Sequence, residues 1–421
     1  MRVLARAMVS HIVLENGRDA LLQRLADPLW FHAFGCVLGF DWNSSGVTTT
    51  VCGALKGGLS GTESELGLYV CGGKGGVSRG TPREIDAFCM RTGQDGEALA
   101  AASRMSAKVD SACVQDGYEL YHHTFIFTPE NRFTVVQQGL RNEDSTARRY
   151  HWLGGPGEIA QLQAVLAGLD PRPRQMELPF EEDGDRGTAG SARNAAVCRP
   201  WPDLLVPRSP IPAPRSFSFV RDPHAAVAGQ VGDGGVPVLN LVAGEAEANR
   251  DASVSATRAT PRELLAELSR IPEDCLVLPR RHEVRPADID PNRLERILLR
   301  TYERRPENYE QLVALEGVGA KTLRALSLAA ELMYGQPVSW RDPARFSFAH
   351  GGKDGHPYPV DRAVYDEVIH HLGETLNRAA VAHAEKTEAL KRLAKWGEAG
   401  SLGTLRHEGH RAQEGRTGGI G

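Results

Sequence analysis

Carboxylates and histidines gather within the first 180 residues of the chain. Asp110 and Asp116 precede the adjacent pair His122 and His123. Together with Asp41, the side chains of Asp110, Asp116 and His122 offer the oxygen and nitrogen ligands that Mg²⁺ or Mn²⁺ takes when it activates water against a phosphodiester. The pattern therefore predicts a divalent-metal site, with Asp110, Asp116, His122 and His123 in catalytic roles.

Basic side chains surround these residues in the sequence. Lys74 lies in the glycine-rich segment 72–76, and Arg104 and Lys108 share one face of a predicted helix. Cations of this kind bind phosphates, so we expect Lys74 to act in catalysis and Arg104 and Lys108 to bind DNA. A structural interpretation is also open, because aspartate is common beside turns and histidine is common in half-buried strands. The spacing matches no known metal motif.

A second candidate site lies at the turn Gly317-Val318-Gly319. Apolar residues at helical spacing predict helices over 306–315 and 320–334, joined by this turn. Two glycines allow the backbone to approach a phosphate closely, and the amides that begin the second helix favour an anion. The sequence predicts that the hairpin binds the DNA backbone through Gly317, Val318, Gly319, Lys321 and Thr322. The alternative is a pair of helices whose glycines only permit close packing.

The segment 315–321, followed by Val360-Asp361, resembles the catalytic hairpin of base-excision DNA glycosylases. The resemblance implies that Lys321 attacks the sugar carbon and that Asp361 stabilises the charge developing on the sugar. These two residues are farther apart here than in that superfamily. Asp361 is also well placed to cap the N-terminus of a helix.

Composition and net charge limit the kinds of protein that this chain can be. The chain has 421 residues and a formal net charge of −4, which predicts local rather than general contact with nucleic acid. Its 7 cysteines are scattered, so we expect free thiols rather than a disulfide framework. No apolar run is long enough to span a bilayer and no signal peptide is evident. These features predict a soluble cytoplasmic protein that does not associate with membranes.

The hydrophobic pattern divides the chain into four zones. Residues 1–180 mix helices and strands, including a hairpin of strands at 118–127 and 133–138, and predict an α+β domain with a small antiparallel sheet. Residues 181–235 are rich in Pro, Gly and Arg and predict a disordered linker. Residues 236–396 predict an all-α domain that contains the helix-hairpin-helix, and residues 397–421 a flexible tail. Thr81 and Glu84 predict a capping box at a helix start.

Several longer motifs resemble the prokaryotic domain-of-unknown-function family numbered 763. The resemblance extends from about Leu22 to Lys395 and excludes the linker, and in that family a further segment usually precedes the position where this chain begins. It implies a helix-hairpin-helix region and a role in DNA metabolism. The motifs are Gly39-Phe40-Asp41-Trp42, Ser45-Gly46-Val47-Thr48-Thr49, Gly72-Gly73-Lys74-Gly75, Lys108-Val109-Asp110, Asp116-Gly117-Tyr118, His122-His123-Thr124-Phe125, Leu239-Asn240-Leu241-Val242 and residues 346–361.

Three functions are compatible with these observations. The first is a DNA-binding, metal-dependent nuclease that acts in DNA repair or metabolism. The second is a helix-hairpin-helix DNA glycosylase or abasic lyase that uses Lys321 and Asp361. The third is a non-catalytic DNA-binding adaptor.

Overall fold

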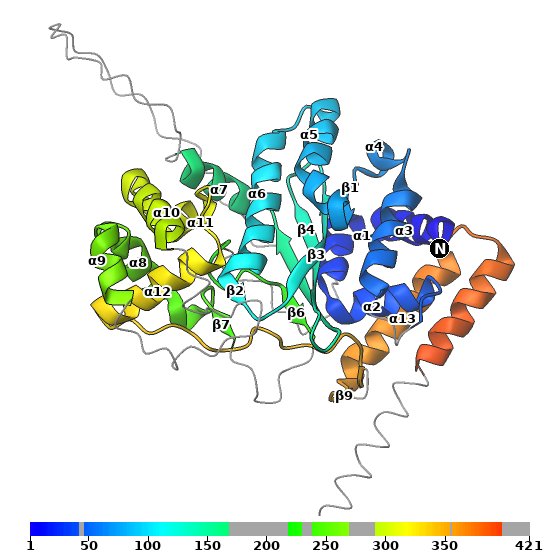
Figure 1. Ribbon diagram of the computed structural model, residues 1–421. Coiled ribbons are helices and arrows are strands. Elements are labelled where there is room, and N and C mark those ends of the chain that lie inside the picture. Colours follow the sequence, from blue (N-terminus) through cyan, green and yellow to red (C-terminus); the bar gives the residue numbers. More distant parts are fainter. Residues whose placement is uncertain (42–45, 168–217, 230–237, 269–290, 354–355, 398–421) are drawn as a thin grey trace, which may run out of the picture.

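A computed structural model describes residues 1–41, 46–167, 218–229, 238–268, 291–353 and 356–397. Its centre is a five-stranded antiparallel sheet in the order β1-β3-β4-β5-β6 (Figure 1). The strands are β1 (Tyr69–Lys74), β3 (Glu119–Phe127), β4 (Phe133–Arg141), β5 (Thr146–Gly154) and β6 (Ala226–Ala228). The predicted hairpin of β3 and β4 is confirmed.

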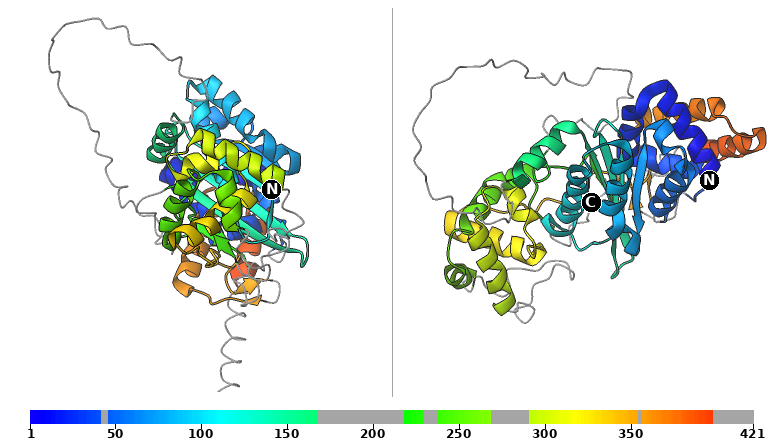
Figure 2. Two further views of the ribbon diagram at one scale, coloured as in Figure 1. Left: turned by 60° about the vertical axis from the view of Figure 1, so that its left-hand side comes forward. Right: turned by 90° about the horizontal axis from the view of Figure 1, so that it is seen from above.

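Helices lie on both faces of this sheet, as Figure 2 shows from two further directions. One face carries α1 (Arg2–Ala26), α2 (Pro28–Val37), α3 (Val47–Leu59) and α13 (Arg362–Arg378). The other face carries α6 (Gly96–Lys108) and α7 (Pro156–Ala167), and beyond them lie α8 (Glu247–Ala256), α9 (Pro261–Leu268), α10 (Pro291–Arg304), α11 (Tyr309–Ala314) and α12 (Ala320–Tyr334). α5 (Thr81–Thr92) packs on β1 and α6, and the short α4 (Glu63–Leu66) precedes β1.

Alternation along the strands contributes side chains to two large hydrophobic cores, and a small third cluster contains Ala147, Ala228 and Phe348. Phe125 and Phe127 of β3 join the core beneath α6, which extends to α11 and α12. Ile126, between them, joins the core formed with α1, α2, α3 and α13. Among the described helices, none is long and apolar enough to cross a membrane. The described cysteines are free and buried, as predicted: Cys36, Cys52, Cys71, Cys89 and Cys113.

The fold class is confirmed: an N-terminal region with a small antiparallel sheet is followed by a helical region. The two regions share secondary structure. β6 forms the edge of the central sheet, and β7 (Leu239–Asn240) pairs with β2 (Val114–Gln115). The remaining strands, β8 (Gly352–Lys353) and β9 (His356–Pro357), form a separate pair. α13 packs against α1 and α2 rather than against α12.

The linker prediction is wrong for residues 218–229. Phe219 and Val220 are buried in the core beneath α6, and β6 pairs with β5. Proline and glycine flank this segment, so its apolar run is too short to change the linker-like composition of the region. The rest of the predicted linker, 181–217 and 230–235, lies outside the described residues, as does almost all of the predicted tail, 398–421.

The predicted capping box at α5 is also wrong. The Glu84 carboxylate accepts from the backbone N–H of Gly72 at 2.8 Å and from Lys56 Nζ at 2.7 Å, instead of capping α5. The Thr81 hydroxyl donates to the Ser78 carbonyl at 2.7 Å. Glu84 therefore attaches α5 to β1 and α3, because tertiary contacts compete with the local cap.

Substitution of Gly72 by alanine is expected to destabilise this edge of the sheet. Gly72 has a φ of +93°, and an added Cβ would lie 2.2 Å from the His123 carbonyl oxygen. The combined strain and overlap should cost about 2–4 kcal/mol in the free energy of unfolding. Urea unfolding measures this loss. Gly76→Ala is the matched control, because no atom lies within 4 Å of its added Cβ; equal stability of the two variants would contradict the predicted contact.

Candidate functional site

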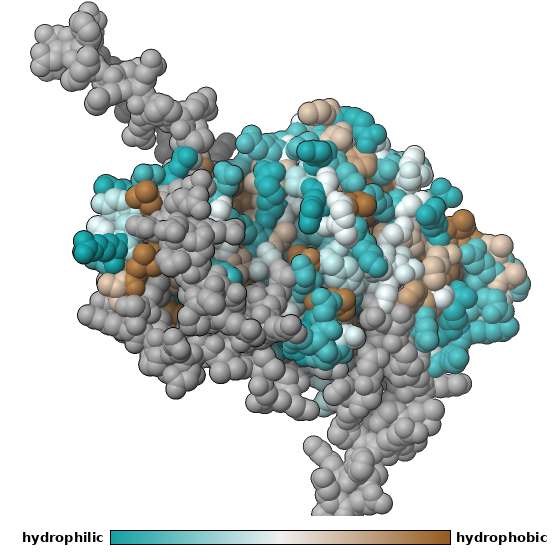
Figure 3. All heavy atoms as spheres, viewed as in Figure 1, coloured by the Kyte–Doolittle hydropathy of each residue, from teal (hydrophilic) through white to brown (hydrophobic). Residues whose placement is uncertain are grey.

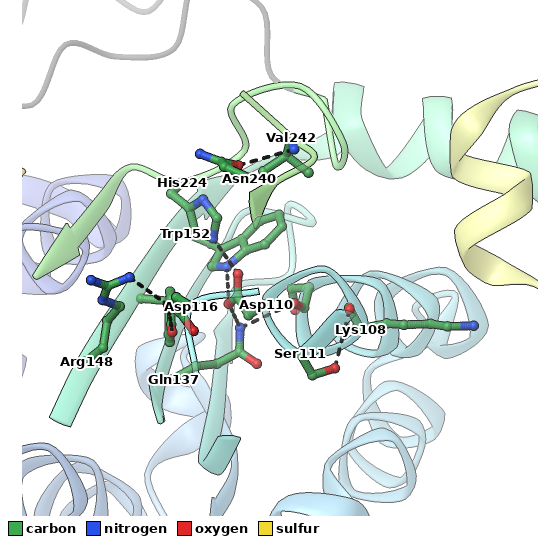
Figure 4. A network of polar contacts seen from close by, with 12 residues as sticks. Lys108, Asp110, Ser111, Asp116, Gln137, Arg148, Trp152, His224, Asn240 and Val242 are labelled. Carbon is green, nitrogen blue, oxygen red and sulfur yellow. Dashed lines mark hydrogen bonds and ion pairs between the residues drawn. The ribbon is translucent and has the colours of Figure 1, made fainter. Parts of the chain in front are cut away.

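A single π-helical turn, η2 (Val109–Cys113), follows α6 without a break. π-turns within helices are frequent at functional sites because they redirect side chains. Here the turn brings Asp110, which is 1% exposed, onto the sheet. Lys108 extends away from the sheet, toward the helical region that holds α11 and α12 (Figure 4). One short segment therefore contacts both the sheet and the hairpin.

Asp110 is the centre of a buried hydrogen-bond network (Figure 4). Its Oδ2 accepts from Trp152 Nε1 at 2.9 Å and from the amide of Gln137. Its Oδ1 is hydrogen-bonded to Nε2 of His224. The network thus joins η2, β4, β5 and the segment that leads into β6.

The network continues through Gln137 to the next strand. Oε1 of Gln137 lies 2.9 Å from Nδ1 of His123, and Nε2 of His123 lies 2.8 Å from the Ser103 hydroxyl. An amide oxygen only accepts, so Nδ1 of His123 carries the proton and Nε2 accepts from Ser103; this tautomer is assigned from the hydrogen-bond pattern. Each hydrogen bond in this series therefore donates toward Asp110: Ser103 donates to His123, His123 to Gln137, and Gln137 to Asp110.

The same reasoning assigns the donor in the hydrogen bond between His224 and Asp110. Burial raises the pKa of Asp110, while its contacts with His224 and Trp152 act in the opposite direction. The carboxylate of Asp110 accepts from its neighbours, so Nε2 of His224 is assigned as the donor, and Nδ1 is the ring nitrogen that does not bond to Asp110. A histidine oriented in this way by a carboxylate is the usual arrangement of a general base.

Asp116 belongs to a different set of contacts. Its carboxylate accepts from Arg148 Nη1 at 2.8 Å and from the Tyr150 hydroxyl at 2.6 Å. Arg148 also pairs with Asp342 at 2.8 Å. Burial, followed by Asp116, raises the pKa of Tyr150 well above its usual value. Asp116 therefore forms a buried ion pair that fixes β5, and the structure does not support the catalytic role predicted for it.

His122 lies on the opposite face of the sheet from His123. Its Nε2 is 2.9 Å from the Thr124 hydroxyl, and its partner across the β1–β3 pair is Lys74. Burial lowers the pKa of His122 to about 3, with His123 and Lys74 adding to the effect. The exposed Lys74 places Nζ 5.8 Å from the centroid of the Tyr121 ring. His122 and Lys74 are thus separated from Asp110 by the sheet.

The structure does not bring the predicted metal ligands together. Asp110 and Asp116 bind different donors, His122 lies across the sheet, and Asp41 is exposed just after α2. Within the described parts of the chain, no group of three or more His, Cys, Asp or Glu side chains could hold a metal ion.

The helices on both sides of Gly317 form as predicted. Gly317 has a φ of +84°, which requires glycine, and Val318 is 3% exposed between the helices. Lys321 is exposed in the first turn of α12, whereas Thr322 is 3% exposed. Thr322 therefore packs inside the protein and is not placed to contact DNA as predicted.

Two side chains of the 108–115 segment hold this turn. Lys108 Nζ donates to the Leu315 carbonyl at 2.7 Å, just before the turn. Gln115 Nε2 donates to the Ala320 carbonyl at 2.9 Å, just after it. Lys108 was predicted to bind DNA, but its ammonium group positions the hairpin instead. Arg104, one turn earlier on α6, is exposed.

Asp361 caps α13, accepting from the backbone N–H groups of Ala363 at 3.1 Å and Val364 at 3.2 Å. α13 packs on α1 and α2, whereas α12, which carries Lys321, packs on α8 and α9 (Figure 1). The structure therefore does not bring Lys321 and Asp361 into one pocket.

The residues that form these contacts lie largely within the part of the chain that matches the model of one known protein family. Residues 1–168 and 212–360 match the family described as "Protein of unknown function (DUF763)". The chain belongs to the DUF763 family. No curated protein and no solved structure matches the chain.

Sequence reasoning missed three members of the Asp110 network in this DUF763 protein: Gln137, Trp152 and His224. His224 was assigned to the linker because prolines precede it. The apolar residues Phe219 and Val220 before it, and residues 226–228 after it, could have indicated a folded segment. Gln137 and Trp152 carry no signal of their own, because their role depends on which strand face meets η2.

The buried histidine of the network should make the DUF763 protein sensitive to acid. Burial lowers the pKa of His123 to about 4 in the folded state, below its unfolded value of about 6.5. The unfolded chain therefore binds more protons, and stability is lost as the pH falls from about 6.5 to about 4.

Replacement of His123 by glutamine should make this slope shallower by about 1.4 kcal/mol per pH unit, measured by urea unfolding at a series of pH values. His370→Gln, at an exposed position, is the control and should leave the slope unchanged. An unchanged slope in His123→Gln would show that His123 titrates normally.

Proposed function

We propose that this DUF763 protein binds the DNA backbone through the hairpin at residues 317–321 and processes the bound strand with the Asp110–His224 pair. One observation carries the proposal: the short segment 108–115 serves both groups. Lys108 and Gln115 hold the two sides of the hairpin turn, and Asp110, between them, orients His224.

The hairpin has the features of a backbone-binding module. Its glycines leave the main chain accessible, and α12 directs its positive end toward the turn. Lys321 adds a cation in the first turn of α12 and Arg104 adds another on α6. Hydrophilic and apolar side chains are mixed over α5 and α6 on the face drawn in Figure 3. The backbone amides of the turn and the two cations suit contact with phosphates rather than with base edges.

The reaction that fits the pair is phosphodiester hydrolysis. Nδ1 of His224 takes a proton from a water molecule while the water oxygen bonds to phosphorus. The bond from phosphorus to the leaving sugar oxygen breaks, and that oxygen takes a proton from solvent. Asp110 stabilises the imidazolium that forms. The predicted Mg²⁺ or Mn²⁺ requirement stays a prediction, tested by cleavage assays with and without a chelator.

The two alternative functions lead to different results. A non-catalytic adaptor would bind DNA and leave the strand intact. A lyase would be trapped on abasic DNA by borohydride without metal. The lyase is less favoured, because Lys321 and Asp361 belong to elements packed in different cores.

The test of DNA binding is the salt dependence of affinity. For a fluorescein-labelled duplex, Lys321→Ala should weaken binding and reduce the slope of log K against log salt by about 0.9, the loss of one phosphate contact. Lys391→Ala is the matched control, because Lys391 is an exposed lysine paired with Glu388. If both variants bind DNA like the wild type, or if the wild type does not bind, the proposal is wrong.

A further inference from the structure

Arg324 is a buried cation close to the hairpin. It lies one turn beyond Ala320 on α12 and is 2% exposed. Its Nε donates to Gln115 Oε1 at 2.7 Å, while its Nη1 is buried without a hydrogen-bond partner. In the described part of the chain, no carboxylate forms an ion pair with it.

A buried guanidinium of this kind lowers the stability of the folded protein. Burial without an opposite charge penalises the guanidinium, and burial lowers the pKa of Arg324 to about 10. A hydrophobic side chain of similar size would fill the same space without this penalty. The fold alone therefore gives no reason for a positive charge at this position.

Arg324 acts on the turn through one intermediate residue. Gln115 accepts from Arg324 with its amide oxygen and donates to the Ala320 carbonyl with its amide nitrogen. On the other side of the turn, the partly buried Lys108 donates to the Leu315 carbonyl. The turn is thus held on one side by Lys108 and on the other by Gln115, which Arg324 binds.

We propose that Arg324 is a positioning residue that prepares the hairpin for a nucleic-acid phosphate; this inference rests on the proposed function. Its contact with Gln115 fixes the start of α12. Its charge, in a region of low dielectric, adds to the positive potential of the helix N-terminus. A phosphate bound at the turn supplies the opposite charge that Arg324 lacks in the free protein.

The experiment compares Arg324→Met and Arg324→Lys, with affinity for a labelled duplex and the unfolding temperature measured for each. We expect Arg324→Met to weaken DNA binding by about tenfold without lowering the unfolding temperature, because it removes an unpaired buried charge. Arg324→Lys should recover most of the affinity.

Affinity is compared at a temperature where every variant is folded. Unchanged affinity in Arg324→Met, or an equal loss in both variants, would overturn the role of the charge. Lys321→Ala, measured in parallel, separates the two proposals. If Lys321→Ala weakens binding and Arg324→Met does not, the inference about Arg324 fails alone; if neither does, the proposed function fails as well.

Discussion

Replacement of His224 by alanine is expected to reduce DNA cleavage by about 10²- to 10⁴-fold, the range for loss of a general base. The affinity for DNA should be unchanged, because His224 is not part of the hairpin. Circular dichroism checks that the variant folds, because the His224 ring contacts the buried rings of Tyr150 and Trp152. Initial cleavage rates on end-labelled single-stranded and duplex DNA measure the effect.

The control is His370→Ala, an exposed histidine on α13. The assay is run with Mg²⁺, with Mn²⁺ and with a chelator, so that metal dependence is measured separately from the role of His224. Cleavage by His224→Ala at the wild-type rate would exclude His224 as the base. Intact DNA with the wild type under every condition would leave the adaptor as the surviving function.

Replacement of Gly317 by proline is expected to weaken DNA binding by about tenfold or more. Proline requires a φ near −65°, whereas Gly317 has a φ of +84°. The substitution therefore reorients the backbone that approaches the phosphate. Fluorescence anisotropy measures the affinity, and circular dichroism checks that the helices persist.

Gly335→Ala is the matched control, since it strains another left-handed glycine, with a φ of +67°, at the opposite end of α12. It should lower stability slightly and leave affinity unchanged. Wild-type affinity in Gly317→Pro would mean that DNA binds elsewhere, or not through the backbone of this turn.

Local signals in the sequence account for the elements that were predicted well. The alternating apolar residues of 119–127 and the turn at 128–131 define the β3–β4 hairpin. Helical periodicity and Gly335 define α12. His122 and His123 lie on opposite faces of the sheet, as period-two alternation along a strand requires, although both were predicted to act in one catalytic site. Such features depend only on residues that are close in the sequence, so the sequence alone predicts them.

The candidate site was only partly predictable, because it depends on contacts between distant segments. Asp110 was identified, but its partner His224 comes from a stretch whose composition resembles a linker. Asp116 was identified for its charge, yet the ion pair with Arg148 gives it a structural role. The separation of Lys321 from Asp361 follows from the packing of α13 on α1 and α2, which no local pattern reveals.

Hydrogen exchange of the backbone amides, with and without a short duplex, tests the central claim most directly. The hairpin should hold the DNA backbone, so the amides of residues 317–323 should become protected when DNA binds, and those of α13 should not change. Protection confined to other parts of the chain, with the hairpin amides exchanging as in the free protein, would contradict DNA binding at this turn.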